Sequence, residues 1–429
     1  MTYSAAVAYL LGLQKHGIKL GLETMAALAR RLGDPQRRYR SLHIGGTNGK
    51  GSTAAMAAGI LQAAGYRVGL YTSPHLVEFR ERIRVDGVMI PEEAVARGTA
   101  AAQEAAGTDL QPTFFESTTA MAFRYFAEAQ VDVAVLEVGL GGRFDATNIV
   151  HPEACVITTV ALDHQEYLGS TLSAIAFEKA GIVKETVPLV VGRMTEEAMR
   201  TIEGIAREKH SPVSALDREF RIEGGADRFA YASRRARYLD LHCGLPGAHQ
   251  VDNAACAIAL TEAASGLQVC ERAVREGVGG VQWEGRLETL EARPDVLLDG
   301  AHNPAGAEAL AAYLRSVKKA RPGSRLIIVL GMMRDKDHKG FMESLNSVAD
   351  RVVLTRASIA RSATAEELRN ELEGVITTPV FVTAAPAEAL ALARQLAAPQ
   401  DVICVTGSLM LIGEVKASWR GCGLSPLRG

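Results

Sequence analysis

The chain has 429 residues, 48% of them hydrophobic and 22% charged, and its formal net charge is −2. A chain of this length is too long for one hydrophobic core, so its composition predicts two globular domains and excludes an extensively disordered protein. The basic clusters are short and scattered along the sequence, which argues against nucleic acid as a partner.

Short runs of β-forming residues alternate with segments of helical periodicity from Leu42 onward. This alternation is typical of a parallel α/β fold. The charged, alternating segment 220–241 predicts a hairpin at the edge of this domain. A helix is expected after the first strand, up to residue 64, and the expected strands of this series are 42–45, 67–72, 131–137 and 155–160.

A second series of strands begins after Arg286, separated by alanine-rich helical segments, and favours a smaller doubly wound domain. These strands are expected at 296–299, 325–331, 351–355, 379–383 and 401–406. We therefore place the first domain at residues 1–285 and the second at residues 286–429.

The segment Ser41–Thr53, Ser-Leu-His-Ile-Gly-Gly-Thr-Asn-Gly-Lys-Gly-Ser-Thr, carries the clearest functional signal. Its four glycines allow backbone conformations in which successive N–H groups turn toward an anion at a helix N-terminus. Lys50 adds a positive charge for terminal phosphates. The strict pattern G-x-x-x-x-G-K-[ST] is not met, because Gly51 follows Lys50, so the segment predicts a variant phosphate-binding loop.

Polar side chains follow three further strands of the first series. Ser73 follows the strand that ends at Thr72, Glu137 ends the next strand, and His164 comes shortly after the last. Ligands of open parallel sheets bind beyond the carboxyl ends of the strands, so these groups would offer a hydroxyl, a carboxylate and an imidazole to a divalent ion. Mg²⁺ fits best, although imidazole is an unusual ligand for it. The structural alternative is a turn at Ser73, a strand-end charge at Glu137 and a loop cap at His164.

Two more segments place polar groups at strand ends. Residues 138–148 combine three glycines with Arg143 and Asp145, a composition that lets a loop lie against a flat ligand, although a surface turn is the alternative. Residues 299–304, Asp-Gly-Ala-His-Asn-Pro, also place polar groups at a strand end, in the second domain. We therefore expect a cleft between the two domains.

These segments together resemble the folylpolyglutamate synthase and dihydrofolate synthase family, within the wider group of Mur-type amide ligases. That family has Gly-Lys-Gly-Ser where the general phosphate loop has Gly-Lys-Ser/Thr, as this chain does. The matching motifs are spread over nearly the whole sequence and include 46–53, 71–75, 137–148, 163–164, 178–181, 247–250, 285–288, 299–304, 335–337 and 406–408.

The resemblance implies a P-loop ATPase domain, a Rossmann-like C-terminal domain, and ATP-driven joining of a pterin-bearing carboxylate to L-glutamate. It implies magnesium ligands at Ser73, Glu137 and His164, and catalytic roles for Lys50, Lys179, Arg286 and His302. The implied pterin site of the bifunctional bacterial members comprises Thr113, Phe115, Asp145 and Ala146. The implied ATP contacts are Gly46, Thr47, Asn48, Gly49, Lys50, Gly51, Ser52, Gln250, Asn253, Arg286, Asp299 and His302.

Several alternatives stay open at this point. Lys179 matches a lysine that is carbamylated in relatives, but unmodified it could be a helix-surface charge. The chain could extend folates only, be another Mur-type ligase, or be a nucleotide-dependent switch without ligase chemistry. It departs from the family pattern at Glu284, where proline is common, and at Met410 and Ser362, so the glutamate contacts are the least secure inference.

The sequence also predicts where the protein is found. Its six cysteines show no CxxC spacing, and Cys155 and Cys404 lie in apolar runs, as expected of buried thiols in a reducing compartment. No apolar run approaches the ~20 residues of a membrane helix, and the N-terminus lacks the basic segment of a signal peptide. We expect a cytoplasmic protein, with small-molecule substrates and no membrane partner, and the resemblance implies a monomer.

Overall fold

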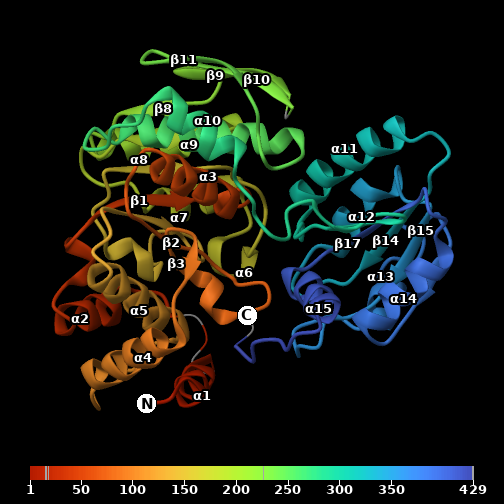
Figure 1. Ribbon diagram of the computed structural model, residues 1–429, viewed down its shortest axis with the longest axis horizontal. Coiled ribbons are helices and arrows are strands. Elements are labelled where there is room, and N and C mark those ends of the chain that lie inside the picture. Colours follow the sequence, from red (N-terminus) through yellow and green to blue (C-terminus); the bar gives the residue numbers. More distant parts are fainter. Residues whose placement is uncertain (15–16, 18, 226, 428–429) are drawn as a thin grey trace. The chain divides into compact units, whose positions relative to one another are not determined.

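The computed structural model describes residues 1–14, 17, 19–225 and 227–427, which form two compact units. The first unit comprises residues 1–75, 79–244 and 250–282, and the second comprises 76–78, 245–249 and 283–429. Both units are α/β, which confirms the predicted fold class (Figure 1). Segments 76–78 and 245–249 belong to the second unit although their sequence neighbours belong to the first, a feature that no sequence signal indicated.

The first unit contains a largely parallel sheet in the order β4-β3-β2-β5-β1-β6-β7-β8. The four predicted strands are confirmed as β1 (Arg40–Gly45), β2 (Val68–Tyr71), β5 (Val133–Glu137) and β6 (Ala154–Ile157). They are buried throughout except at Arg40, as expected for parallel strands covered on both faces. The sequence did not predict β3 (Ile83–Val85), β4 (Val88–Met89), β7 (Leu189–Val191) or β8 (Val213–Ala215).

Helices surround this sheet and include the predicted one, α3 (Lys50–Ala63), which contacts β1, β2 and β5. Nearly all of α3 is buried, because small residues dominate it and the helix α10 (Glu271–Gly279) packs closely against it. The remaining helices of this unit are α1 (Tyr3–Leu13), α2 (Glu23–Arg31), α4 (Glu92–Ala106), α5 (Phe114–Glu128), α6 (Gln165–Leu168), α7 (Leu172–Ala180), α8 (Glu196–Glu208), α9 (Ala248–Ala263) and α10 (Glu271–Gly279).

The segment predicted as a hairpin forms a separate antiparallel sheet in the order β11-β10-β9. Its strands are β9 (Phe220–Gly225), β10 (Arg228–Ser233) and β11 (Arg237–Leu241). The hairpin prediction was therefore incomplete, because β11 adds a further strand. Tyr231 stacks on Tyr238 with ring centroids 5.9 Å apart, which gives this small sheet an aromatic core.

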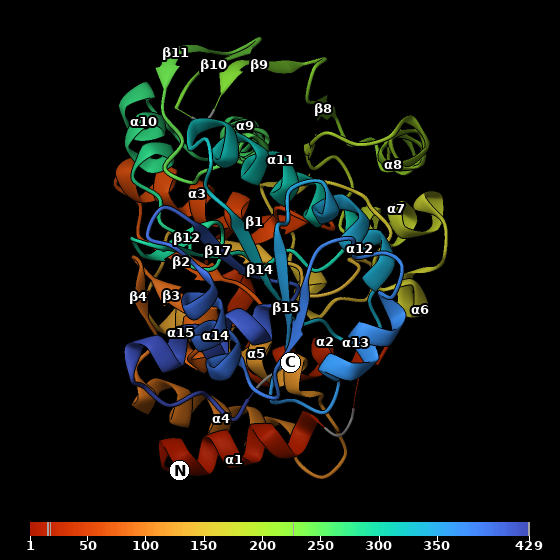
Figure 2. The same ribbon diagram turned by 90° about the vertical axis from the view of Figure 1, so that its right-hand side faces the viewer.

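The second unit has a sheet in the order β12-β13-β17-β14-β15-β16. The five predicted strands are confirmed as β13 (Asp295–Leu298), β14 (Leu326–Leu330), β15 (Arg351–Leu354), β16 (Val380–Val382) and β17 (Val402–Thr406), and β12 (Glu288–Glu291) adds an antiparallel edge. Its hydrophobic core has one cluster with α11 (Pro304–Ala320), α12 (His338–Asn346) and α13 (Ala365–Glu371), and another with α14 (Pro386–Leu396) and α15 (Leu409–Arg420). This division shows the doubly wound arrangement, with helices on both faces of the sheet (Figures 1 and 2).

Two further sequence predictions can be compared with the structure. All six cysteines are free thiols, and Cys155 and Cys404 are buried, as predicted. Among the described residues, no helix combines the length and apolar character needed to cross a membrane.

Candidate functional site

The sheet order of the first unit brings the predicted strand ends together at one edge. β5 and β6 pair directly with β1, and β2 pairs with β5, all in parallel register. The carboxyl ends of these four strands are therefore neighbours. The condition on which the magnesium prediction depended, that these strands lie beside the strand of the phosphate loop, is met.

The phosphate loop, residues 46–49, requires glycine at both of its ends. Gly46 has φ +141° and Gly49 has φ +85°, conformations that other residues rarely adopt. A Cβ at Gly46 would lie 2.0 Å from Thr158 Oγ1, and one at Gly49 would lie 2.2 Å from Asn253 Oδ1. The loop is therefore fitted tightly against the segment after β6 and against α9.

Hydrogen bonds to residues after β6 fix the shape of this loop. Thr47 N donates to Thr159 O at 2.8 Å, and Asn48 N donates to Thr159 Oγ1 at 2.9 Å. The hydroxyl of Thr158 donates to Asn48 O at 2.6 Å. The prediction that successive loop amides turn toward an anion is therefore wrong for Thr47 and Asn48, because Thr159 already accepts both. The role of Thr158 and Thr159 was missed, although two adjacent hydroxyls at a strand end were a visible signal.

The first turn of α3 supplies the groups that remain for an anion. The amides of Gly51 and Ser52 have no acceptor inside the helix, as at any helix start. Ser52 is 1% exposed, and its hydroxyl has no hydrogen-bond partner among the described residues. A buried hydroxyl without a partner costs free energy, and a phosphate oxygen or a hydrated metal ion would satisfy it. In the general motif the Ser or Thr follows the lysine directly, so Ser52 lies one position further along the chain.

Two lysines converge on the carbonyl of Gly46. Lys50 Nζ donates to Gly46 O and to Thr47 O, each at 3.1 Å, and Lys179 Nζ donates to Gly46 O at 2.9 Å. Lys179 is 4% exposed, so its interpretation as a helix-surface charge is wrong. Burial and the positive charge of Lys50 lower the pKa of Lys179 to about 7, although Asp163 opposes this change.

The structure joins two of the three predicted magnesium ligands. Ser73 N donates to Glu137 Oε2 at 3.1 Å, and the Glu137 side chain is buried at the end of β5. His164 stands at the N-cap of α6 with φ +50°, beside Asp163 at 3.9 Å, but its side chain makes no capping hydrogen bond. Within the described parts of the chain, no three His, Cys, Asp or Glu side chains form a metal-binding group; the predicted set contains only two such residues with one serine.

Phe115 and Asp145, two residues of the predicted pterin site, meet at Gly139. The ring of Phe115 lies so close to Gly139 that a Cβ there would be 2.5 Å from Phe115 Cζ. Asp145 Oδ2 accepts hydrogen bonds from Gly139 N at 3.0 Å and Leu140 N at 2.9 Å. Burial raises the pKa of Asp145, while hydrogen bonds from its own loop oppose this. Asp145 therefore holds the shape of loop 138–148, and the loop is more than a surface turn.

The other two residues of that predicted site flank these contacts. Thr113 is the N-cap of α5 in a capping box, accepting from Glu116 N at 3.1 Å while its own amide donates to Glu116 Oε2 at 2.7 Å. Ala146 follows Asp145 and is 5% exposed. The Thr113 hydroxyl and the Glu116 carboxylate therefore both stabilise the start of α5, the helix that carries Phe115.

The remaining predicted ATP contacts form two small groups, one in each unit. In the first unit, Asn253 Nδ2 donates to Gln250 Oε1 at 2.9 Å on α9, and Asn253 faces Gly49. In the second unit, Asp299 Oδ2 accepts from Leu287 N at 3.0 Å, and His302 Nδ1 lies 2.8 Å from Gly300 O. A Cβ on Gly300 would lie 2.4 Å from the guanidinium of Arg286, so Arg286, Asp299 and His302 are neighbours.

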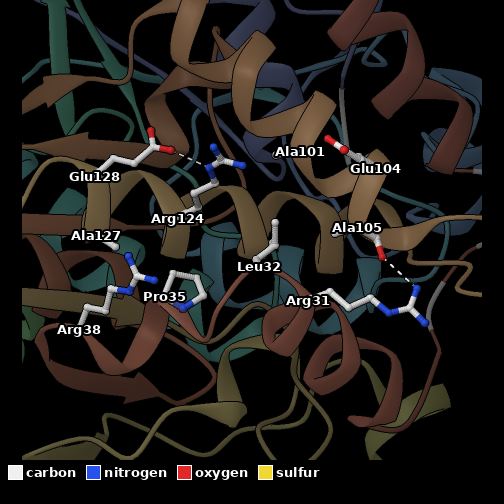
Figure 3. A pocket seen from close by; sticks show the side chains of 10 residues that line it. All are labelled: Arg31, Leu32, Pro35, Arg38, Ala101, Glu104, Ala105, Arg124, Ala127 and Glu128. Atoms are coloured by element: carbon white, nitrogen blue, oxygen red, sulfur yellow. Dashed lines mark hydrogen bonds and ion pairs between the residues drawn. The ribbon is translucent and has the colours of Figure 1, made fainter.

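A separate cavity of about 470 Å³ in the first unit contains none of the predicted residues (Figure 3). Arg31, Arg38 and Arg124 line it together with Glu104 and Glu128. Arg124 pairs with Glu128 at 2.6 Å, and Arg31 pairs with Asp109. Two of the three arginines are therefore paired with carboxylates, and Arg38 donates to the carbonyl of Gly33.

Comparisons with known proteins agree with this geometry. The chain matches the Mur ligase middle domain over residues 44–261 and the Mur ligase, glutamate ligase domain over residues 285–409. The matches and the fold define an ATP-dependent, amide-forming ligase of the Mur type.

Similar proteins narrow the class. The dihydrofolate synthase/folylpolyglutamate synthase of Bacillus subtilis is 35% identical, with 96% of this chain and 98% of the relative covered. The structure of Escherichia coli FolC in complex with DHPP and ADP is similar with a TM-score of 0.91, 35% identity and 98% of both chains covered. The bifunctional enzyme of Yersinia pestis, complexed with AMPPNP and a Mn ion, has a TM-score of 0.88, 32% identity and the same coverage. The chain belongs to the dihydrofolate synthase/folylpolyglutamate synthase family.

Proposed function

We propose that this protein uses ATP to join L-glutamate to dihydropteroate, giving dihydrofolate, and to the glutamyl tail of reduced folates. The observation that carries this proposal is the convergence of Lys50 and Lys179 on Gly46 O, beside loop 138–148 and Phe115. The Ser52 hydroxyl, which has no hydrogen-bond partner among the described residues, lies in the first turn of the helix that follows. Relatives that cover nearly the whole chain bear the names of both synthase activities.

The chemistry explains why such a site needs ATP. A carboxylate is a poor acylating agent because its leaving group would be oxide. Transfer of the γ-phosphoryl group of ATP to a carboxylate oxygen gives an acyl phosphate and ADP. The glutamate amine then attacks the acyl carbon, the C–O bond to phosphate breaks, and the amine loses a proton as the amide forms. Positioning of the two reactants supplies much of the rate acceleration, so a dedicated base is not required.

The residues of this chain divide this work. We propose that Lys50 and the first turn of α3 bind the phosphates of ATP, with Gln250 and Asn253 in the first unit and Arg286, Asp299 and His302 in the second as further ATP contacts. The chemistry of the donors fits a magnesium ion, because the Ser73 hydroxyl and the Glu137 carboxylate offer hard oxygen ligands, and His164 is proposed as the third. Bound magnesium would neutralise charge on the transferred phosphoryl group.

The pterin assignment distinguishes a bifunctional enzyme from one that only extends folates. Thr113, Phe115, Asp145 and Ala146 are all present, and Phe115 meets the loop that Asp145 organises. The exposed side of an aromatic ring next to a glycine-rich loop suits a flat pterin ring. We therefore favour both activities, with folate extension alone as the alternative.

An ADP-release assay with ATP, Mg²⁺ and L-glutamate tests the proposal directly. It should be run separately with dihydropteroate, with a reduced folate and with a UDP-sugar peptide substrate of cell-wall ligases. Release with both pterins supports the bifunctional assignment, and release with the folate alone supports the alternative. Release with only the UDP-sugar substrate would identify another Mur-type ligase. ADP release that is independent of glutamate would indicate a nucleotide-dependent switch.

We also propose that the protein is cytoplasmic and monomeric. A cytoplasmic location is supported by the six free thiols, which suit a reducing compartment. A monomeric state is implied by the family resemblance, and light scattering of the purified protein would measure it.

A further inference from the structure

A lysine with no solvent exposure joins two carboxylates in the second unit. Lys416, on α15, is 0% exposed and bonds Glu284 Oε2 at 3.0 Å and Glu288 Oε1 at a shorter distance. Arg420, one turn further along α15, donates to Glu284 Oε1 at 2.7 Å. Burial raises the pKa of Glu284, but the hydrogen bonds from Arg420 and Lys416 outweigh it and hold the pKa below its usual value. This cluster has two positive and two negative charges, so it is internally neutral.

The two carboxylates stand at the two ends of one tight turn, residues 284–288. Within it, Gly285 has φ +70° and Leu287 has φ +50°, so the backbone adopts two left-handed conformations. Glu288 Oε2 also accepts from Gly285 N at 2.8 Å. A turn of this kind is strained at Leu287 and persists only where its surroundings hold it in place. Lys416 bonds both of its ends.

Arg286 lies at the centre of this turn. Its guanidinium donates to Gly285 O at 3.0 Å and lies against Gly300. Gly300 N donates to the same carbonyl, Gly285 O, at 2.9 Å. Asp299 Oδ2 receives Leu287 N, so the turn is also tied to the segment that contains Asp299 and His302. The direction of the Arg286 side chain therefore depends on the shape of the turn that Lys416 holds.

We propose that Lys416 is a positioning residue of the ligase reaction, which fixes both ends of the 284–288 turn and thereby orients the Arg286 guanidinium for ATP. This inference rests on the ATP contact proposed for Arg286. Lys416 itself has no exposed surface with which to touch a substrate, so its effect passes through the turn. Loss of its charge leaves Glu288 and Glu284 without their shared cation and frees the turn to relax.

The test is a double-mutant cycle of Lys416→Met with Arg286→Ala, measured in the full-length protein. Lys416→Met should raise the KM for ATP about tenfold in the wild-type background. In the Arg286→Ala background the same change should alter that KM by less than about twofold, because its target is gone. Thermal unfolding, measured in parallel, should show a similar loss of Tm in both backgrounds, since the ion pairs that Lys416→Met removes, to Glu284 and Glu288, do not involve the guanidinium. Arg420→Met is the matched control, because it removes the other cation of Glu284 but leaves Lys416 bound to both carboxylates.

Three outcomes would overturn the inference. The first is an unchanged KM for ATP in Lys416→Met, and the second is an equal increase of that KM in both backgrounds. The third is an Arg286→Ala protein with an unchanged KM for ATP, which also removes the ATP role of Arg286 but leaves the ligase assignment to the ADP-release assay with pterin substrates. If Lys416→Met does not fold, Glu288→Gln replaces it in the same cycle, because it removes one carboxylate charge and retains an amide acceptor.

Discussion

Replacement of Lys179 with methionine should change how the stability of the protein depends on pH. The ammonium group is buried, bonds Gly46 O at 2.9 Å and faces the charge of Lys50. Burial and that repulsion lower its pKa from 10.5 to about 7. At about 1.36 kcal/mol per pKa unit, this difference corresponds to about 5 kcal/mol against the charged form.

The sign of the effect follows from proton linkage. The folded-state pKa of Lys179 is lower than the unfolded value, so the unfolded chain binds the extra proton between pH 7 and 10.5. The penalty is fully present below pH 7, and the free energy of unfolding rises as pH increases through that window. Between pH 7.5 and pH 9, Lys179 should add about 2 kcal/mol to the free energy of unfolding.

Urea unfolding of the wild type and of Lys179→Met at these two pH values measures the increment. Buffers should be depleted of CO₂, because a neutral amine reacts with CO₂ to form a carbamate. Burial also lowers the pKa of Lys184, to about 8, but Lys184 is present in both proteins and its contribution cancels in the difference. We expect the wild type to gain about 2 kcal/mol more than the variant. Equal gains in the two proteins would refute the argument that burial makes Lys179 neutral.

Three further predictions concern activity. Lys50→Ala should lower turnover by on the order of 10²-fold or more, because it removes charge stabilisation at the phosphates. The control Lys319→Ala, at an exposed lysine, should keep the wild-type rate. Near-normal turnover of Lys50→Ala would contradict the phosphate role of Lys50. Glu137→Gln should raise the Mg²⁺ concentration needed for half-maximal ADP release by about tenfold or more, and an unchanged Mg²⁺ dependence would exclude Glu137 as a ligand. Phe115→Ala should raise the KM for dihydropteroate about five- to tenfold while the KM for ATP stays the same, and an unaffected dihydropteroate KM would remove Phe115 from the pterin site.

Most of the main strands were predictable because they are short apolar runs bounded by polar or glycine-rich segments. β5 and β17 are buried throughout, and their sequences, Val-Ala-Val-Leu-Glu and Val-Ile-Cys-Val-Thr, are almost entirely apolar. The missed strands β7 and β8 are three residues long, too short for a periodic signal. β11 was missed because the charged segment around it suits a hairpin as well as it suits three strands.

The site was predictable where function constrains local sequence, and less so where tertiary contacts decide. The glycines at positions 46 and 49 predict the loop, but nothing in the sequence Glu-Lys-Ala-Gly at residues 178–181 indicates that Lys179 is buried. At position 284 the family resemblance predicts proline, whereas this chain has glutamate. In the structure the Glu284 side chain bonds Lys416 and Arg420, contacts that no local sequence signal indicates.

The electrostatics of the phosphate loop indicate a polyphosphate ligand more strongly than the sequence pattern of the loop does. Thr159 accepts the amides of Thr47 and Asn48, so the loop keeps its shape without a ligand. The ammonium groups of Lys50 and Lys179 both donate to the carbonyl of Gly46. Two cations so close together repel each other, and this repulsion is relieved if one of them loses its proton or if an anion binds beside them. A bound phosphate would stabilise the protonated form of Lys179, and by reciprocity a protonated Lys179 would strengthen phosphate binding. The Ser52 hydroxyl, which lacks a hydrogen-bond partner in the described part of the chain, adds a donor at the same helix start. One ligand, a nucleotide phosphate, would therefore relieve the repulsion and also supply the missing hydrogen bond.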